Sequence, residues 1–194
     1  HWALREVLGE HVKQAGSLVE PDRLRFDFSH YAAVSPEELQ EIERIANLQV
    51  LKNCGVSVYE TSKDEATKAG AIAFFGDKYG DLVRVLDAGD SVELCGGTHV
   101  CATGDIGAIK ILSESSIGSN LRRIEAVAGT HSLAFIQQQN VTLSHAAELL
   151  GATPDTLNAY IERKIDDMRA LQDENRILRS RLAATQAVEI AETA

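Results

Sequence analysis

No stretch of the 194-residue chain approaches the roughly 18 consecutive apolar residues of a bilayer span, and the opening lacks the basic and apolar regions of a secretion signal. Cysteines number only three, Cys54, Cys95 and Cys101, and an odd count does not make a disulfide framework. Basic residues are outnumbered, 19 against 29 acidic ones, and the net charge of −10 argues against broad adhesion to nucleic acid or anionic membrane. These absences indicate a cytoplasmic protein without a membrane anchor.

Hydrophobic residues make up 44% and charged residues 25% of the chain, values that are ordinary for one or two folded domains. Almost all glycines and strand-like runs precede residue 130, whereas helical periodicity dominates after it. We therefore predict a domain at 1–130 and a helical region at 131–194. The chain opens at His1 without a methionine, inside a helix-like run, and we expect it to be a fragment of a longer protein.

Local patterns in the first domain predict an α+β fold, with a mixed or antiparallel sheet packed by helices. Leu24, Phe26 and Phe28 alternate with charged residues, as in a half-buried strand over 23–29. A capping box with proline at the first helical position, 35–38, opens a helix that should run to about residue 53. Short apolar runs follow at 56–59, 71–75, 82–86, 108–112 and 124–127. We expect a core that contains Leu24, Phe26, Phe28, Ile42, Ile45 and Val127.

The second region is predicted to be a helical hairpin. One helix covers about 132–150 and stops at Gly151, and another restarts at Thr153-Pro154. From Leu157 to Leu182, eight positions that step alternately by four and three form a seam, of which six are apolar: Leu157, Ile161, Lys164, Met168, Leu171, Asn175, Leu178 and Leu182. This period is typical of a coiled coil, with Asn175 as a polar seam residue. Packing against the chain's own domain is the equally open alternative.

The segment Glu93-Leu-Cys-Gly-Gly-Thr-His-Val100 carries the clearest chemistry. A thiol and an imidazole, Cys95 and His99, flank a Gly-Gly turn that can aim both side chains at one point, as in half of a zinc site. A Cys and a His at this spacing are more often a core thiol and a hydrogen-bonded imidazole. The glycine pair shifts that balance, because glycines are poor choices unless a turn or a closely approaching ligand needs them.

Several further motifs stand in register with this segment. It is followed by Thr103-Gly-Asp-Ile-Gly107, Ser113-Glu-Ser115 and Arg122-Arg-Ile-Glu-Ala126, and preceded by Arg5-Glu-Val-Leu-Gly9, His11–Leu18 and Arg25–His30. Over residues 1 to 130 this series resembles the editing domain of alanyl-tRNA synthetase. The helical remainder resembles the start of that family's carboxy-terminal region, which leads to an oligomerisation and tRNA-binding module. Free-standing alanine-editing proteins share the first part.

The resemblance implies hydrolysis of the ester bond of tRNA(Ala) mischarged with serine or glycine, since an alanine pocket rejects neither strongly. In the family, zinc is held by a His-x-x-x-His pair and by the Cys and His that align with Cys95 and His99. The pair is absent, and His1 aligns with a third His that follows it, so we expect the chain to begin just after two of four ligands. We predict that this chain binds zinc weakly or not at all and is inactive, unless His1 or Cys101 substitutes.

The resemblance also suggests roles for three other residues. Gln14 aligns with a polar residue of the editing pocket, where its amide would bind the ester or amino group; otherwise it is an exposed residue at a helix end. Thr98 would offer its hydroxyl beside the metal or cap a turn. Arg122 and Arg123 should face opposite sides of a strand, with Arg122 meeting acceptor-end phosphates and Arg123 pairing with Glu125 or facing solvent.

Three functional hypotheses remain open. The leading one is a zinc-dependent deacylase domain within a synthetase, which acts on the acceptor end of tRNA(Ala) together with the rest of the synthetase chain. The second is a non-catalytic piece that binds tRNA through the Arg122 region and forms homo-oligomers through the helix at 157–182. The third is a free-standing editing factor, which has no evident need for that helix. No phosphate loop, dinucleotide fingerprint or serine-nucleophile motif is present, so ATP binding and aminoacylation do not belong to this sequence.

Overall fold

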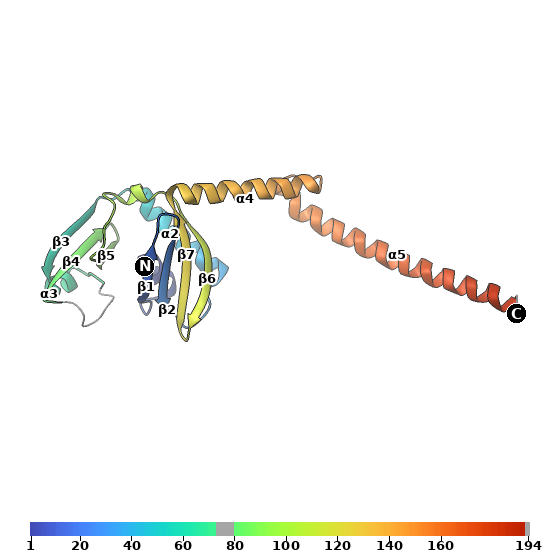
Figure 1. Ribbon diagram of the computed structural model, residues 1–194, viewed down its shortest axis with the longest axis horizontal. Coiled ribbons are helices and arrows are strands. Elements are labelled where there is room, and N and C mark those ends of the chain that lie inside the picture. Colours follow the sequence, from blue (N-terminus) through green and yellow to red (C-terminus); the bar gives the residue numbers. More distant parts are fainter. Residues whose placement is uncertain (73–79, 193–194) are drawn as a thin grey trace. The chain divides into compact units, whose positions relative to one another are not determined.

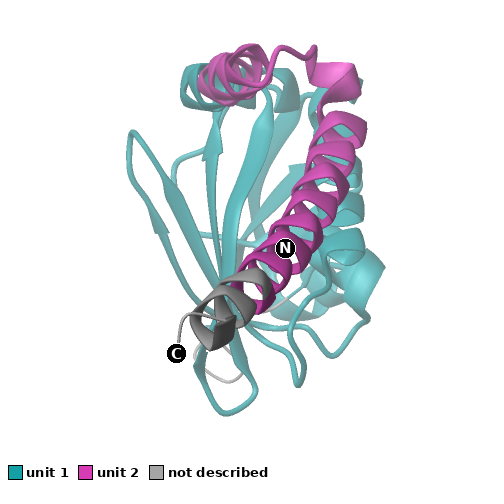
Figure 2. Cartoon of the chain, turned by 90° about the vertical axis from the view of Figure 1, so that its right-hand side faces the viewer, with its two compact units in different colours: residues 1–136 teal, residues 137–194 magenta. Residues whose placement is uncertain are grey.

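The computed structural model describes residues 1–72 and 80–192, which fall into two compact units, His1–Ile136 and Gln137–Ala194 (Figure 2). No helix in these ranges is long and apolar enough to cross a membrane, and all three cysteines are free. The elements are, in chain order (Figure 1), α1 (Trp2–Leu8), β1 (Gln14–Val19), β2 (Leu24–Ser29), α2 (Pro36–Lys52), β3 (Val56–Ser62), α3 (Lys63–Lys68), β4 (Leu82–Ala88), β5 (Ser91–Leu94), the short turn η2 (Thr103–Ile106), β6 (Ile109–Gly118), β7 (Leu121–Ala128), α4 (Gly129–Leu149), η3 (Pro154–Thr156) and α5 (Leu157–Glu192).

Four antiparallel strands form the larger sheet of the first unit, in the order β1-β2-β7-β6. Its main core lies where α1 and α2 pack on one face of the sheet, with Phe28 and Val12 completely buried. Because side chains alternate between the faces of a strand, Phe26 and Phe28 both point into this core. The rest of the buried cluster consists of Ala3, Leu4, Leu8, Val34, Ile42, Ile124 and Ala126.

The predicted core is confirmed in part. Phe28, Ile42 and Val127 are buried, whereas Leu24, Phe26 and Ile45 are partly exposed and pack against the buried cluster. Leu24 pairs with Val19 at the end of the β1–β2 hairpin. Val19 is 82% exposed, so the hairpin end extends beyond the helices that cover the sheet.

Helix α2 begins and ends as the sequence predicts. The Ser35 hydroxyl accepts the Glu38 N–H at 3.1 Å, and the Glu38 carboxylate accepts the Ser35 N–H at 2.8 Å, which completes the capping box. The helix stops where Asn53 adopts a left-handed conformation with φ 49°. Both ends of the helix are therefore set by local residues.

Strands β3, β4 and β5 form a second antiparallel sheet with its own small core of Ala66, Val83, Val85 and Leu94. Two strands, β1 and β5, were not predicted. The half-buried side of β1 carries Gln14, Gly16 and Leu18, so its sequence shows no apolar alternation, and β5 has only four residues. Of the predicted run at 71–75, residues 73–75 lie outside the described residues, and Ile72 forms a single bridge to Glu93.

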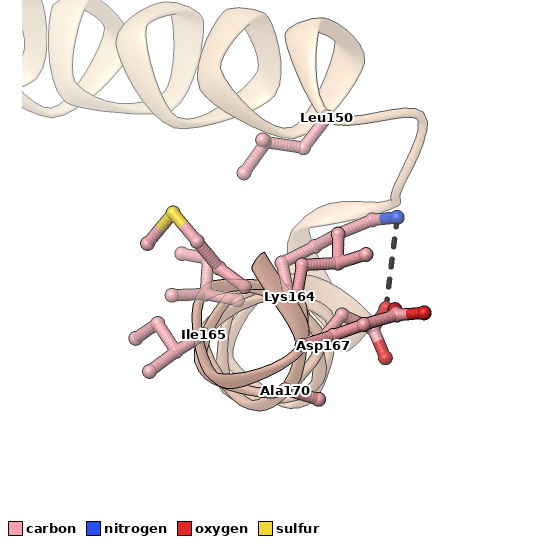
Figure 3. Close-up of a pocket in the computed structure, with 9 residues that line it drawn as sticks. Leu150, Lys164, Ile165, Asp167 and Ala170 are labelled. Carbon is pink, nitrogen blue, oxygen red and sulfur yellow. Dashed lines mark ion pairs between the residues drawn. The ribbon is translucent and has the colours of Figure 1, made fainter. Parts of the chain in front are cut away.

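In the second unit, α4 gives way to α5 at Gly151, whose φ is 67°, and the turn η3 leads into the long helix. Leu150 faces the first part of α5 across a groove that Ile161, Ile165 and Met168 also line (Figure 3). The predicted seam is exposed from the groove onward: Leu171, which also lines the groove, and Leu178 and Leu182 beyond it are between 53% and 64% accessible. Within the described part of the chain, α5 therefore does not pack its whole seam against a neighbouring helix.

Candidate functional site

The Cys-Gly-Gly-Thr-His segment is a loop that directly follows β5. The Cys95 N–H donates to the carbonyl oxygen of Arg84 at 3.1 Å and so extends the β4–β5 pairing by one residue. The chain then leaves the sheet, and His99 Nε2 lies 3.3 Å from Cys95 Sγ. The two side chains therefore converge on one point, as the spacing predicted, while their role as metal ligands stays a prediction.

His99 has the environment of a neutral imidazole. Burial lowers its pKa, the positive charge of Arg84 lowers the pKa further, and the Glu93 carboxylate opposes both effects. Its Nδ1 is buried and has no hydrogen-bond partner among the described residues. A neutral imidazole is the form that binds a metal, so the environment favours the ligating state.

Gly97 lies directly beside the two donor atoms. A Cβ built at this position would stand 3.6 Å from Cys95 Sγ and 3.7 Å from His99 Nε2. Neither Gly96 nor Gly97 has a left-handed φ, so the turn does not require glycine, contrary to one of the two reasons expected from the sequence. The other reason, room for something that approaches closely, fits the space at Gly97.

The donor chemistry fits zinc, because thiolate sulfur and imidazole nitrogen are its preferred ligands and Gly97 leaves room beside both. Within residues 1–72 and 80–192, however, no group of three or more His, Cys, Asp or Glu side chains is placed to hold a metal. His1 lies instead beside Glu93, with its Nδ1 3.6 Å from the carboxylate, and Cys101 is exposed. Neither residue completes a three-ligand set with Cys95 and His99.

The two predicted pocket residues occupy different elements. Thr98 is exposed on the loop next to His99. Gln14 is the first residue of β1, in the larger sheet, and not a helix-end residue as the alternative interpretation held. Its amide N–H donates to Ser17 Oγ at 2.9 Å. Among the described residues no hydrogen bond joins Gln14 to the Cys95–His99 loop, so its role stays a prediction.

The adjacent arginines of β7 face opposite sides of the sheet, as predicted, and both are engaged in ion pairs. Arg122 forms a two-pronged pair with Glu114, with Nη2 2.6 Å from Oε2, and its side chain is only 15% exposed. Arg123 pairs with Asp27 at 2.7 and 2.8 Å, and not with Glu125 as expected, because Asp27 is its direct cross-strand partner. Contact between Arg122 and RNA stays a prediction, and it requires the guanidinium to leave Glu114.

The 103–107 motif follows the loop and has a structural role. The buried Thr103 hydroxyl donates to the Gln49 carbonyl oxygen at 2.8 Å and accepts the Cys54 N–H at 3.0 Å. These bonds fix the chain that follows His99 against the end of α2. The motif therefore places the loop and takes no part in the Cys95–His99 pair.

Sequence reasoning did not single out Arg84. Its guanidinium donates to the carbonyl oxygens of Cys95 and Gly97, at 3.2 and 2.5 Å. Between Val83 and Val85 on a strand, an arginine has the pattern of an ordinary solvent-facing residue. Only the pairing of β4 with β5 brings it to the loop.

Comparison with known proteins first defines the class. Residues 83–125 match the family described as the second additional domain of threonyl and alanyl tRNA synthetases. The match runs from β4 through the Cys95–His99 loop and into β7. The site therefore lies inside a domain that is typical of these synthetases.

Individual relatives distinguish between the threonyl and the alanyl synthetases. The chain is 50% identical over 191 residues to an alanine–tRNA ligase of Pelotomaculum thermopropionicum and 48% identical over 194 residues to one of Bordetella parapertussis. These matches cover 98% and 100% of this chain but 22% of each relative, so the chain spans about a fifth of their length. They confirm the resemblance carried by the motifs: the chain corresponds to a segment of alanyl-tRNA synthetase.

Proposed function

We propose that this segment edits mischarged tRNA(Ala) by hydrolysing the ester bond to serine or glycine. The single observation that carries the proposal is the convergence of Cys95 Sγ and His99 Nε2 beside Gly97, which has no side chain to fill the space next to the two donor atoms. In the family pattern a His-x-x-x-His pair, which this sequence does not contain, supplies the other two zinc ligands. The partners are then the acceptor end of tRNA(Ala) and the rest of the synthetase, in the cytoplasm.

In the reaction, a water oxygen adds to the ester carbonyl carbon, the bond from that carbon to the ribose oxygen breaks, and the ribose oxygen takes a proton. The products are the free amino acid and uncharged tRNA. Bound zinc would polarise the carbonyl or activate the water. Cys95 and His99 would be two of its ligands, and the exposed residues 96–98 leave the loop open to the RNA end.

A second candidate function is assembly. Met168, Leu171 and Leu182 on the seam of α5 are more than half exposed. A row of exposed apolar side chains on one face of a helix is typical of a surface that binds a partner. A partner helix of the same kind would bury them. This role is compatible with editing, since the two sets of residues lie in different units.

The proposal is tested by release of serine from mischarged tRNA(Ala), measured with a synthetase chain that contains this sequence and the upstream histidine pair. We expect Cys95→Ala to slow the release by more than the ~10–100-fold that is typical of losing a residue that only orients a ligand. Gly97→Ala should also slow it, because the added methyl group stands beside both donors. Gly96→Ala is the matched control, since no atom lies within 4 Å of its added Cβ.

Zinc content gives an independent test. After dialysis we expect this chain to retain well under one zinc ion, because two protein ligands fall short of the three or four that zinc sites use. The longer chain should retain zinc and lose it on Cys95→Ala. Stoichiometric zinc in the short chain, or serine release that is unaffected by Cys95→Ala in the long chain, would contradict the proposed site.

A further inference from the structure

Arg84 projects from β4 toward the loop that carries the paired cysteine and histidine. Its Nη1 donates to the Cys95 carbonyl oxygen at 3.2 Å and to the Gly97 carbonyl oxygen at 2.5 Å. Its own carbonyl oxygen accepts the Cys95 N–H at 3.1 Å. One residue therefore holds the loop by both its backbone and its side chain.

We propose that Arg84 is the positioning residue of the site: its guanidinium fixes the carbonyl groups of Cys95 and Gly97 and thereby sets the separation of Cys95 Sγ from His99 Nε2. The consequence for hydrolysis rests on the proposed function. The positioning itself concerns only residues of this chain and can be tested without metal or RNA.

The hydrogen-bond partners of Arg84 support a dedicated role in positioning the loop. Glu60 is its direct cross-strand partner on β3, yet no carboxylate of the described residues lies within ion-pair distance of the guanidinium. A strand arginine opposite a glutamate would ordinarily form that pair. Here the side chain is directed to two carbonyl groups of a loop instead.

The loop has few other restraints. Residues 96–98 are exposed, and the described residues show no hydrogen bond from the backbone N–H groups of Gly96 or Thr98. Two glycines also leave the backbone with wide conformational freedom. Without the guanidinium, the peptide groups that join Cys95 to Gly96 and Gly97 to Thr98 would be free to rotate. The bond to the Cys95 N–H would then hold only the start of the loop.

The chemistry of the arginine side chain suits a contact with two carbonyl groups. Both bonds come from one nitrogen, Nη1, whose two N–H groups point in fixed, diverging directions in the plane of the guanidinium, so each can reach one carbonyl oxygen. Lysine has a single ammonium group on a flexible chain, and methionine has comparable length but no donor. The series Arg84→Lys and Arg84→Met therefore separates charge and length from the two-carbonyl contact.

The test is NMR of the His99 ring in this chain at pH 8.5, about two units above the ordinary imidazole pKa of about 6.5, so that loss of the Arg84 charge does not change the protonation state of the ring. The ring nitrogen and carbon-bound proton shifts are the readout. Cys95→Ala defines the signals of an imidazole that has lost its sulfur neighbour. We expect Arg84→Met to move the His99 signals most of the way to the Cys95→Ala position, and Arg84→Lys to give an intermediate position. Arg44→Met is the matched control, because Arg44 makes an exposed ion pair with Glu41 and should leave His99 unchanged.

Methyl signals of Val83 and Val85 report whether the β4 core stays folded in each variant. His99 signals that remain at wild-type positions in a folded Arg84→Met chain would overturn the proposal. If Arg84→Met unfolds the sheet, Arg84→Lys decides, since wild-type signals in that variant would show that the two-carbonyl contact is dispensable. Moved signals in a long chain that releases no serine even as wild type would uphold the positioning role and refute the proposed function.

Discussion

At the scale of single residues, Gly107 combines a left-handed backbone conformation with a close backbone neighbour. Its φ is +67°, and an added Cβ would stand 2.8 Å from the backbone Cα of Gly129, which cannot move without displacing the start of α4. We expect Gly107→Ala to lower the free energy of unfolding by about 2–4 kcal/mol, from left-handed strain and overpacking together. Urea denaturation followed by circular dichroism measures the loss.

Gly96→Ala is the control for this prediction, because it has no positive φ and nothing lies within 4 Å of the added Cβ. It should change stability by no more than about 0.5 kcal/mol, as surface substitutions usually do. Equal losses in the two variants would show that the close approach of Gly107 to Gly129 is not what constrains the chain.

Contacts between residues divide into those that the sequence predicts and those that only the fold creates. Cys95 and His99 are four residues apart, so their convergence depends on a short loop and follows from the pattern. Arg84 reaches the loop only through the β4–β5 pairing. Arg123 pairs with Asp27, which is 96 positions away, whereas the sequence suggested its near neighbour.

At the scale of elements, the same distinction explains which helices and strands were predicted. Helix α2 carries its boundaries in its own residues, from the Ser35 capping box to Asn53. Strand β1 has a register shift after Gln14, and its Gly16 and Ser17 give no apolar alternation, so only its pairing with β2 defines it. Local signals thus predict elements that are stable by local chemistry and miss those that tertiary pairing creates.

The α2 cap gives a prediction at this scale. Ser35→Ala removes the acceptor of the Glu38 N–H, which is left without its partner at the helix start. We expect a loss of about 1 kcal/mol in the free energy of unfolding. Ser57→Ala on the exposed part of β3 is the control and should be close to neutral; an equal effect of both substitutions would argue against the cap.

The exposed seam of α5 gives a second prediction at the scale of elements. Burial of a leucine side chain contributes about 1.5–3 kcal/mol, so exposed Leu171, Leu178 and Leu182 favour pairing with a second helix of the same kind. We expect light scattering to show self-association that Asn175→Leu strengthens and Leu171→Glu weakens. Gln172→Glu adds the same charge beside the seam and should leave the mass unchanged. A monomeric chain, with Asn175→Leu also monomeric, would remove the coiled-coil interpretation.

At the scale of the whole molecule, stability depends on pH through ionisable groups that the fold buries. His30 is 6% exposed, its Nδ1 lies 2.9 Å from His11 Nε2, and the two rings stack. Burial lowers the pKa of His30, the charges of His11 and Arg122 lower it further, and Glu38 and Glu114 act in the opposite direction. The folded chain therefore holds His30 neutral at a pH where the unfolded chain already binds the proton.

The sign of the effect follows from proton linkage. Because the folded pKa of His30 lies below the unfolded value of about 6.5, the unfolded state binds more protons between the two values, and stability is lost as pH falls through that window. Between the folded and the unfolded pKa, one group changes the free energy of unfolding by at most about 1.4 kcal/mol per pH unit. The pKa of His99 is also lowered, so His99 adds to the loss of stability as the pH falls. The lowered pKa of Asp27 makes the chain less stable only when the pH falls below the ordinary aspartate pKa of about 4.

We therefore expect the free energy of unfolding, measured in urea at pH 7, 6 and 5, to fall toward acid. His30→Gln keeps a polar group at the site but cannot take up the proton, so its curve should be flatter over the same interval. His131→Gln, which replaces an exposed histidine of α4, is the control and should keep the wild-type slope. A slope in His30→Gln that equals the wild-type slope would show that His30 carries no part of the acid sensitivity, because the lost proton-binding group is the only term that this substitution removes from the linkage.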